Sequence, residues 1–261
     1  MKNPKAGQSI TVRAEGLTKI FHTRGGDEIR AVDDLSFSCR SGEIMGILGP
    51  NGAGKTTALR MLTTILSPTA GKATVNGYRV GQSPQRVRDS VGFLATETGL
   101  YERLTAEETL NFFGRINGLS EKELGKRKKE VFQTLDMTDF ARRKVGDLST
   151  GMKQKLSLAR SIIHDPPILI FDEPTRGLDV MTAKTVTDYV KRFKEEDKTI
   201  ILSTHLMNVV ERLCDRVGIL FEGKLKALGR IEELLEERSV ADLEELFFSL
   251  AEDSKVKKNQ R

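Results

Sequence analysis

The sequence predicts an α/β fold, and three patterns along the chain carry this prediction. Residues 10–49 contain short strand-like stretches separated by turn residues. From residue 56 onward, helical patterns alternate with brief apolar segments such as 168–171 and 199–203. Residues 100–147 carry helical signals and no clear strand. We therefore expect a sheet covered by helices, a strand-rich N-terminal region and a helical insertion.

The apolar segments 168–171 and 199–203 are predicted to be strands in the centre of the sheet. Both are almost wholly apolar and are bounded by proline or charged residues. Apolar runs of this length are typical of parallel strands that helices cover on both faces. The core of the protein should therefore be a parallel sheet between two layers of helices.

Two further regions are predicted to be helical. Residues 100–147 combine helix caps with helical periodicity, and we expect them to form a subdomain inserted into the α/β core. Within them, the basic run 126–129 lies among acidic residues at helical spacing, which favours a solvated helix face over a basic binding patch. Near the C-terminus an apolar stripe is expected to pack on the core, with a dimer contact as the alternative: Leu243, Leu246, Phe247 and Leu250.

Composition indicates a globular protein of a reducing compartment. The 261 residues carry a net charge of +5 from 42 basic and 37 acidic side chains, a dispersed excess that does not predict nucleic-acid binding. Cys39 and Cys214 have no metal-ligand spacing. The N-terminal residues lack the apolar core of a signal peptide, and no window approaches about 18 consecutive apolar residues. We expect any membrane role to depend on another chain.

The segment 49–57 (GPNGAGKTT) matches the phosphate-binding P-loop pattern and predicts a P-loop NTPase core. A strand is expected before it and a helix after it, so that backbone N–H groups wrap the phosphates at a helix start. Lys55 is expected to reach the β- and γ-phosphate oxygens, and the Thr56 hydroxyl to hold Mg²⁺. The predicted ATP-binding residues of this segment are Gly49, Pro50, Asn51, Gly52, Ala53, Gly54, Lys55, Thr56 and Thr57.

Three polar side chains are expected at the carboxyl edge of the same sheet, where open α/β folds bind ligands. Asp172 and Glu173 follow segment 168–171, and His205 follows segment 199–203. Asp172 is expected to orient Mg²⁺ and Glu173 to polarise the attacking water. His205 is expected to hold the γ-phosphate and water in line. The alternative, a solvent-facing acidic strand end, is disfavoured by the P-loop.

A second anion-binding feature lies at 148–154 (LSTGMKQ), ahead of a predicted helix. Ser149 is a good N-cap, Gly151 allows a ligand to approach the backbone, and the N–H groups of a helix start favour negative charge. The P-loop already accounts for the phosphates of one nucleotide. The sequence therefore leaves open which anion this second feature binds.

Taken in order, these motifs resemble those of the nucleotide-binding subunit of ATP-binding cassette (ABC) transporters over about residues 10–225. The resemblance implies an N-terminal antiparallel β subdomain and a helical subdomain inserted at about 97–150. Residues 226–261 are then a helical C-terminal extension with a loose basic tail. The P-loop corresponds to the Walker A motif of the family.

The resemblance also implies roles for single residues. Asp172 corresponds to the Walker B aspartate, Glu173 to the catalytic glutamate and His205 to the switch histidine. Asp179 lies in the D-loop and is implied to contact nucleotide. Phe21 stands where the family places an aromatic side chain that stacks on adenine, and a core phenylalanine is the alternative.

Three positions depart from the family pattern. Thr150 replaces the first of two signature glycines, and Met152 stands where glutamine is frequent. Thr96 occupies the glutamine position of the Q-loop, and its short side chain lacks the reach of a glutamine amide. We expect Glu97 or a transmembrane partner to supply the missing contact, or coupling to be looser.

The resemblance implies an ATPase that uses ATP and Mg²⁺ to power a membrane exporter, with sodium extrusion a closer match than drug export. Two copies are expected to sandwich ATP, so that Ser149 and Gly151 of one copy meet the γ-phosphate held by the other. The expected partners are transmembrane permease subunits and a second copy, without nucleic acid, at the cytoplasmic face of the cell membrane. The alternatives are a soluble ABC ATPase acting on ribosomes or nucleic acid and a nucleotide switch without hydrolysis.

Overall fold

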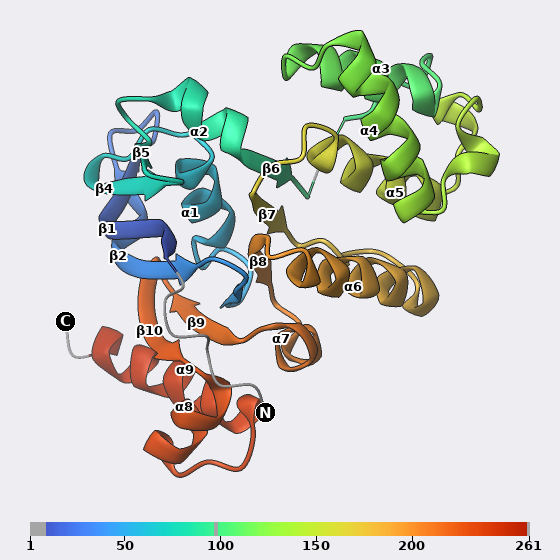
Figure 1. The fold of residues 1–261 in the computed structure, drawn as a ribbon. Coiled ribbons are helices and arrows are strands. Elements are labelled where there is room, and N and C mark those ends of the chain that lie inside the picture. The colour runs from blue at the N-terminus through green and yellow to red at the C-terminus, as the bar shows by residue number, and fades with distance from the viewer. Residues whose placement is uncertain (1–8, 97–98, 260–261) are drawn as a thin grey trace.

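Two β-sheets and the helices around them form the part of the chain that the computed structural model describes, residues 9–96 and 99–259, with 255–259 described by backbone alone (Figure 1). The larger sheet has the strand order β10-β9-β3-β8-β7-β6. Its neighbouring strands are parallel except for the antiparallel pair β9-β10. The strands are β3 (Ile44–Leu48), β6 (Val91–Leu94), β7 (Ile168–Asp172), β8 (Thr199–Thr204), β9 (Arg216–Phe221) and β10 (Lys224–Gly229). The predicted α/β fold is confirmed.

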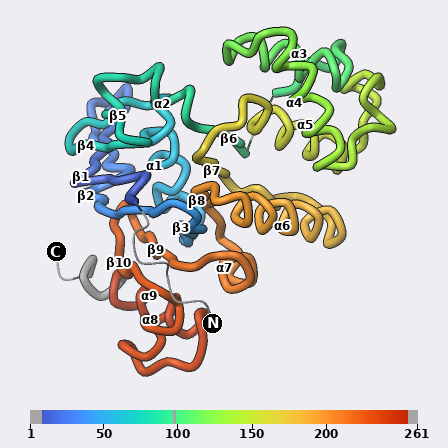
Figure 2. The backbone as a smooth tube through the Cα atoms, in the orientation of Figure 1, coloured from blue at the N-terminus to red at the C-terminus, as the bar shows by residue number. Residues whose placement is uncertain are grey.

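The central strands are apolar because their alternate side chains enter two different cores. In β7, Leu169 and Phe171 pack with residues of the inserted helical subdomain and of α6 (Val180–Glu195). Ile168 and Ile170 pack with α1 (Lys55–Leu62) and the smaller sheet. Figure 2 shows β8 between α1 on one side and α6 on the other. Burial of both faces thus explains the continuous apolar runs.

The smaller sheet is antiparallel, as predicted, with the order β2-β1-β4-β5. Its strands are β1 (Ile10–His22), β2 (Glu28–Arg40), β4 (Ala70–Val75) and β5 (Tyr78–Arg79), and α2 (Pro84–Ser90) follows them. Ile20 pairs with Arg30 whereas Lys19 pairs with Val32, so Ala31 is an extra residue in β2. Such a bulge bends a strand locally, and here it brings Ala31 against the P-loop.

The helical subdomain is inserted between β6 and β7 and projects away from both sheets (Figure 1). It contains α3 (Ala106–Ile116), α4 (Glu121–Thr134), two short 3₁₀ helices (Thr138–Phe140 and Val145–Asp147) and α5 (Thr150–Ile162). Capping boxes begin α3 at Thr105 and α4 at Ser120. In the basic run 126–129, Lys126 and Lys129 are exposed as predicted, whereas Arg127 and Lys128 are largely buried in ion pairs with Glu130 and Glu107.

The C-terminal residues form α8 (Ile231–Arg238) and α9 (Leu243–Asn259), which pack against β9 and α7 (Met207–Leu213). Leu243, Leu246 and Leu250 are buried there, so the predicted packing of this stripe on the core is confirmed. Strand β10 crosses the boundary expected at 225/226, because its half-buried edge position gave the segment no continuous apolar run. Within the described residues, no helix has the length and apolar character to span a membrane.

Candidate functional site

The P-loop connects the carboxyl end of β3 to the first residue of α1. Gly52 and Gly54 have φ values of 79° and 100°, which side chains rarely adopt. A Cβ atom on Gly54 would lie 2.3 Å from the Ala31 carbonyl oxygen, and one on Gly49 would lie 2.4 Å from the Leu220 carbonyl oxygen. The glycines therefore let the loop lie directly on β2 and β9.

Lys55 lies inside the loop and is only 5% exposed. Its Nζ donates to the carbonyl oxygens of Gly49 (2.7 Å) and Pro50 (3.1 Å) and lies 3.4 Å from Oε1 of Glu173. The ammonium group is thus held at the mouth of a helix N-terminus, where backbone N–H groups also favour anions. This arrangement places one fixed positive charge where a nucleotide phosphate would bind.

Thr56 and Asp172 form a paired set of oxygen ligands. The Thr56 hydroxyl lies 3.0 Å and 2.9 Å from the two carboxylate oxygens of Asp172. Hydroxyl and carboxylate oxygens suit Mg²⁺, which in nucleotide sites takes one or two protein ligands besides phosphates and water. Among the residues that the structure describes, no group of three or more His, Cys, Asp or Glu side chains forms a metal cage. The donor set therefore fits a metal shared with phosphates.

Glu173 and His205 form a second pair at the same sheet edge. Nδ1 of His205 lies 3.0 Å from each carboxylate oxygen of Glu173. Glu173 has a positive φ of 51°, and its N–H donates to the Ser203 carbonyl oxygen at 3.1 Å. Its carboxylate therefore turns toward Lys55 and His205 while that of Asp172 turns toward Thr56. The two adjacent carboxylates thus take different partners, as the sequence predicted.

A cavity of about 290 Å³ opens at this edge of the sheet. Besides P-loop residues, it is lined by three residues that the sequence reasoning did not assign to the nucleotide: Ala31, Thr96 and Arg176. The Thr96 hydroxyl donates to the Asp172 carbonyl oxygen at 3.2 Å, so it takes a structural bond beside the site. Glu97, the proposed substitute for the missing glutamine, lies outside the described residues.

Ser203 was also missed by sequence reasoning. Its hydroxyl donates to Oδ1 of Asp172 at 2.5 Å and accepts from the Glu173 N–H at 3.2 Å. The sequence did offer a signal for Ser203: it is a polar residue near the end of a buried apolar strand, two positions before His205. Ser203 thus connects the Asp172 carboxylate to the backbone of Glu173.

The signature segment lies apart from this cavity. Ser149 is exposed and caps α5, where its hydroxyl accepts from the Met152 N–H at 3.3 Å. A Cβ atom on Gly151 would lie 3.1 Å from the hydroxyl oxygen of Thr182 in α6. Asp179 accepts a hydrogen bond from that same hydroxyl at 2.7 Å, which lowers the pKa of its carboxyl. Ser149, Gly151 and Asp179 therefore form one surface that does not line the chain's own phosphate cavity.

Phe21 lies near the end of β1 and is 39% exposed, so the alternative of a core phenylalanine is wrong. It pairs with Ile29 of β2, two residues before Ala31 of the cavity wall. The Lys19 ammonium lies 5.3 Å from the ring centre. An exposed aromatic ring on this strand is compatible with adenine stacking, which stays a prediction.

Comparison with known proteins identifies the family of the chain and several of its relatives. Residues 32–176 match the family model described as ABC transporter. The chain is 42% identical over 222 residues to the ABC transporter ATP-binding protein NatA of Bacillus subtilis, covering 85% of this chain and 90% of NatA. It is 38% identical over 223 residues to the linearmycin resistance ATP-binding protein LnrL of Bacillus subtilis, covering 85% of this chain and 70% of LnrL.

A solved structure agrees with these sequence relatives. The dimeric post-hydrolysis state of the ATP-binding cassette MJ0796, bound to ADP and Pi, superposes with a TM-score of 0.77 at 27% identity. The match covers 84% of this chain and 98% of that cassette. Membership of one family accounts for the P-loop cavity, the paired carboxylates, the two sheets and the inserted helices. The chain belongs to the ABC transporter family as an ATP-binding, ATP-hydrolysing subunit.

Proposed function

We propose that this chain powers a membrane exporter, with sodium ions as the cargo. The observation that carries the transporter part of the proposal is the 42% identity to the ABC transporter ATP-binding protein NatA along nearly the whole length of both chains. The sodium cargo rests on the resemblance of the sequence motifs to those of the sodium-extrusion group. The site contributes the chemistry: a phosphate loop, a metal ligand pair and a buried carboxylate held by His205. A non-hydrolysing switch would not need Glu173 and His205 in contact.

Within the site, each residue has a distinct task in ATP hydrolysis. The P-loop N–H groups and Lys55 bind the β- and γ-phosphates, and Thr56 with Asp172 would hold Mg²⁺, which neutralises phosphate charge when bound. A water oxygen attacks the γ-phosphorus while the bond to the β–γ bridging oxygen breaks, giving ADP and phosphate. Glu173 accepts the proton of that water, and His205 keeps the Glu173 carboxylate oriented.

Two copies of the chain are proposed to complete each other's sites. Ser149 and Thr150 are exposed, lie outside the lining of the chain's own cavity and begin α5, and such a helix N-terminus is suited to an anion. The γ-phosphate held by the P-loop of a second copy is the proposed anion. The dimeric form of MJ0796, which is bound to ADP and Pi, supports this arrangement.

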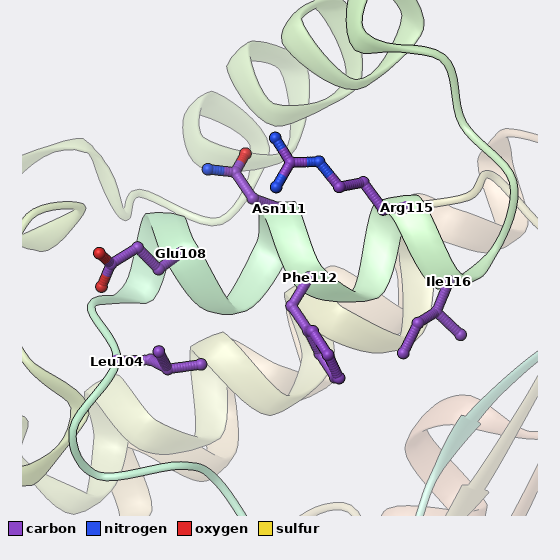
Figure 3. A pocket seen from close by; sticks show the side chains of 6 residues that line it. All are labelled: Leu104, Glu108, Asn111, Phe112, Arg115 and Ile116. Atoms are coloured by element: carbon purple, nitrogen blue, oxygen red, sulfur yellow. The ribbon is translucent and has the colours of Figure 1, made fainter.

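The exposed side of α3 is the proposed contact for a transmembrane subunit. A cavity of about 460 Å³ there is lined by Leu104, Glu108, Asn111, Phe112, Arg115 and Ile116. In Figure 3, Phe112 and Ile116 project from one side of the helix, and Asn111 and Arg115 from the other. Phe112 is 41% exposed and Ile116 is 63% exposed. Large apolar side chains left in water on one helix favour burial by another protein.

The test of the proposed function is a transport assay in membrane vesicles. The chain is co-expressed with a candidate multi-span membrane subunit, and uptake of radioactive sodium into inside-out vesicles is followed. The expected result is ATP-dependent uptake in the wild type and none with Glu173→Gln. Uptake that does not depend on ATP or on Glu173 would contradict the proposal. Export of a hydrophobic drug without sodium movement would support the proposal that the chain powers an exporter but contradict sodium as its cargo.

A further inference from the structure

The turn between β9 and β10 lies against the P-loop rather than in open solvent. Residues 222 and 223 form this two-residue turn, with φ values of 47° and 78°. Two positive φ values are typical of the tight turns that join antiparallel strands. The N–H of Gly223 donates to the Ala53 carbonyl oxygen in the P-loop at 3.0 Å, and its own carbonyl oxygen accepts from the Asp33 N–H in β2 at 2.9 Å.

The position of the turn leaves little room for a side chain at 223. A Cβ atom there would lie 3.0 Å from the Ala31 carbonyl oxygen and 3.1 Å from the Val32 Cα atom. Both neighbours are backbone atoms of β2 and have no rotamer by which to move aside. A side chain at this position would therefore shift the turn, the bulge of β2 or both.

The bond from Gly223 sets the direction of one N–H group in the phosphate site. The Ala53 carbonyl and the Gly54 N–H belong to the same trans peptide unit, so they point in opposite directions. Holding the carbonyl toward Gly223 directs the Gly54 N–H away from the turn, and Gly54 itself lines the phosphate cavity. Donors fixed before binding lose less entropy when a ligand arrives.

The turn itself is held from two sides. The Lys224 ammonium lies 3.1 Å from Oδ2 of Asp33, and this bond lowers the pKa of the Asp33 carboxyl. On the other side, the ring of Phe221 packs on Phe247 of α9 at 4.8 Å between ring centres. The hairpin thus connects the C-terminal helices and β2 to the phosphate loop (Figure 1).

We propose that Gly223 is a positioning residue for ATP binding. Its N–H fixes the Ala53 peptide, so the P-loop presents its N–H donors in the geometry that the phosphates require. Gly223 touches neither substrate nor reacting atoms, and it acts only through the loop. Changes at this turn should therefore weaken ATP binding and leave the chemical step unchanged.

The test compares Gly223→Ala with a matched control. Gly77→Ala is suitable because Gly77 also follows a positive-φ residue in a tight turn and has a φ of 80°, but its Cβ would meet nothing within 4 Å. Both variants carry the same backbone strain. Gly223→Ala is expected to raise the Kd and the KM for ATP about tenfold, the loss of one hydrogen-bond contribution, with kcat at saturating ATP within about twofold. Gly77→Ala should leave all three unchanged.

Melting temperature is measured for both variants to separate stability from binding. Gly223→Ala is expected to melt at a lower temperature than Gly77→Ala, because its Cβ also meets the backbone of β2. ATP affinity is therefore measured well below both melting temperatures. Should Gly223→Ala not fold, Gly223→Asn and Gly77→Asn replace the pair, since asparagine adopts positive φ more readily. Equal ATP affinity in the two variants, or a fall in kcat without a rise in KM at Gly223, would overturn the proposal.

Discussion

A single buried side chain, Ser203, connects the two residues that are proposed to act in hydrolysis, Asp172 and Glu173. Ser203 is fully buried, and its one hydroxyl bonds both Asp172 and the backbone of Glu173. Removing it would leave a buried carboxylate oxygen with one donor fewer, which costs more than the same loss in water. The effect should appear in the chemical step, because both carboxylates are proposed to act there.

Ser203→Ala is expected to lower kcat for ATP hydrolysis by about ten- to a hundredfold, which corresponds to about 1.4–2.7 kcal/mol of transition-state stabilisation. Phosphate release at saturating ATP is the measurement. The control is Ser157→Ala, because the Ser157 hydroxyl donates only to the Lys153 carbonyl of its own helix. An unchanged kcat in Ser203→Ala would show that the carboxylates do not depend on this hydroxyl.

His164, between α5 and β7, is expected to make the protein less stable in acid. The ring is largely buried, and this burial lowers its pKa below the usual value of about 6.5, more than the nearby Val91 backbone raises it. Below about pH 6.5 the unfolded chain takes up a proton that the folded chain refuses. Stability is therefore fully present above about pH 6.5 and is lost as the pH falls toward the lowered pKa.

The measurement for His164 is the free energy of urea unfolding from about pH 7.5 to pH 5. In the acidic part of this range, the free energy of unfolding should fall more steeply in the wild type than in His164→Gln. The expected difference in slope is up to about 1.4 kcal/mol per pH unit. His22→Gln serves as the control, because the His22 side chain is 67% exposed. Identical pH dependence in wild type and His164→Gln would contradict the assignment.

At the level of elements, α9 belongs to the core that supports β9. Leu246→Ala is expected to lower the free energy of unfolding by about 2–5 kcal/mol, because Leu246 is fully buried and its truncation leaves a cavity. Phe248→Ala, at a position that is 55% exposed, should change it by less than about 1 kcal/mol. The free energy of unfolding of both variants is measured by chemical denaturation. Equal effects would mean that α9 is loosely attached.

The elements that the sequence predicted are those whose own residues carry the signal. Apolar runs identified β7 and β8, and caps with helical periodicity identified the inserted helices. Strand β10 was missed because its side chains are half-buried at a sheet edge and alternate with lysines. The bulge at Ala31 has no local signal, since it exists only in the pairing of β1 with β2.

The same division applies to the site. Motif residues such as Lys55, Asp172 and Glu173 were assigned from spacing, and the structure brings them together. Arg176 and Ala31 line the cavity through tertiary contacts that a single sequence does not encode locally. Gly223 is a further example, because the partner of its N–H lies far away in the chain.

For the whole molecule, the central question is whether one chain holds a complete site. Its own cavity contains the P-loop and Glu173, whereas Ser149 and Asp179 lie on a different surface. The proposed pairing of two copies gives that second surface a ligand. It also gives a role to the exposed N-cap at Ser149, because a helix start is suited to bind an anion.

Mixing two inactive variants tests this claim most directly. Lys55→Ala removes the phosphate-binding ammonium, and Ser149→Arg should leave ATP binding to the monomer nearly intact while blocking ATP-driven pairing. In a mixed pair, Lys55 of the Ser149→Arg copy faces Ser149 of the Lys55→Ala copy, which restores one complete site. Energy transfer between labelled variants and phosphate release are measured. We predict ATP-dependent pairing and partial hydrolysis only in the mixture; no recovery in the mixture, or loss of monomer ATP binding in Ser149→Arg, would contradict the account.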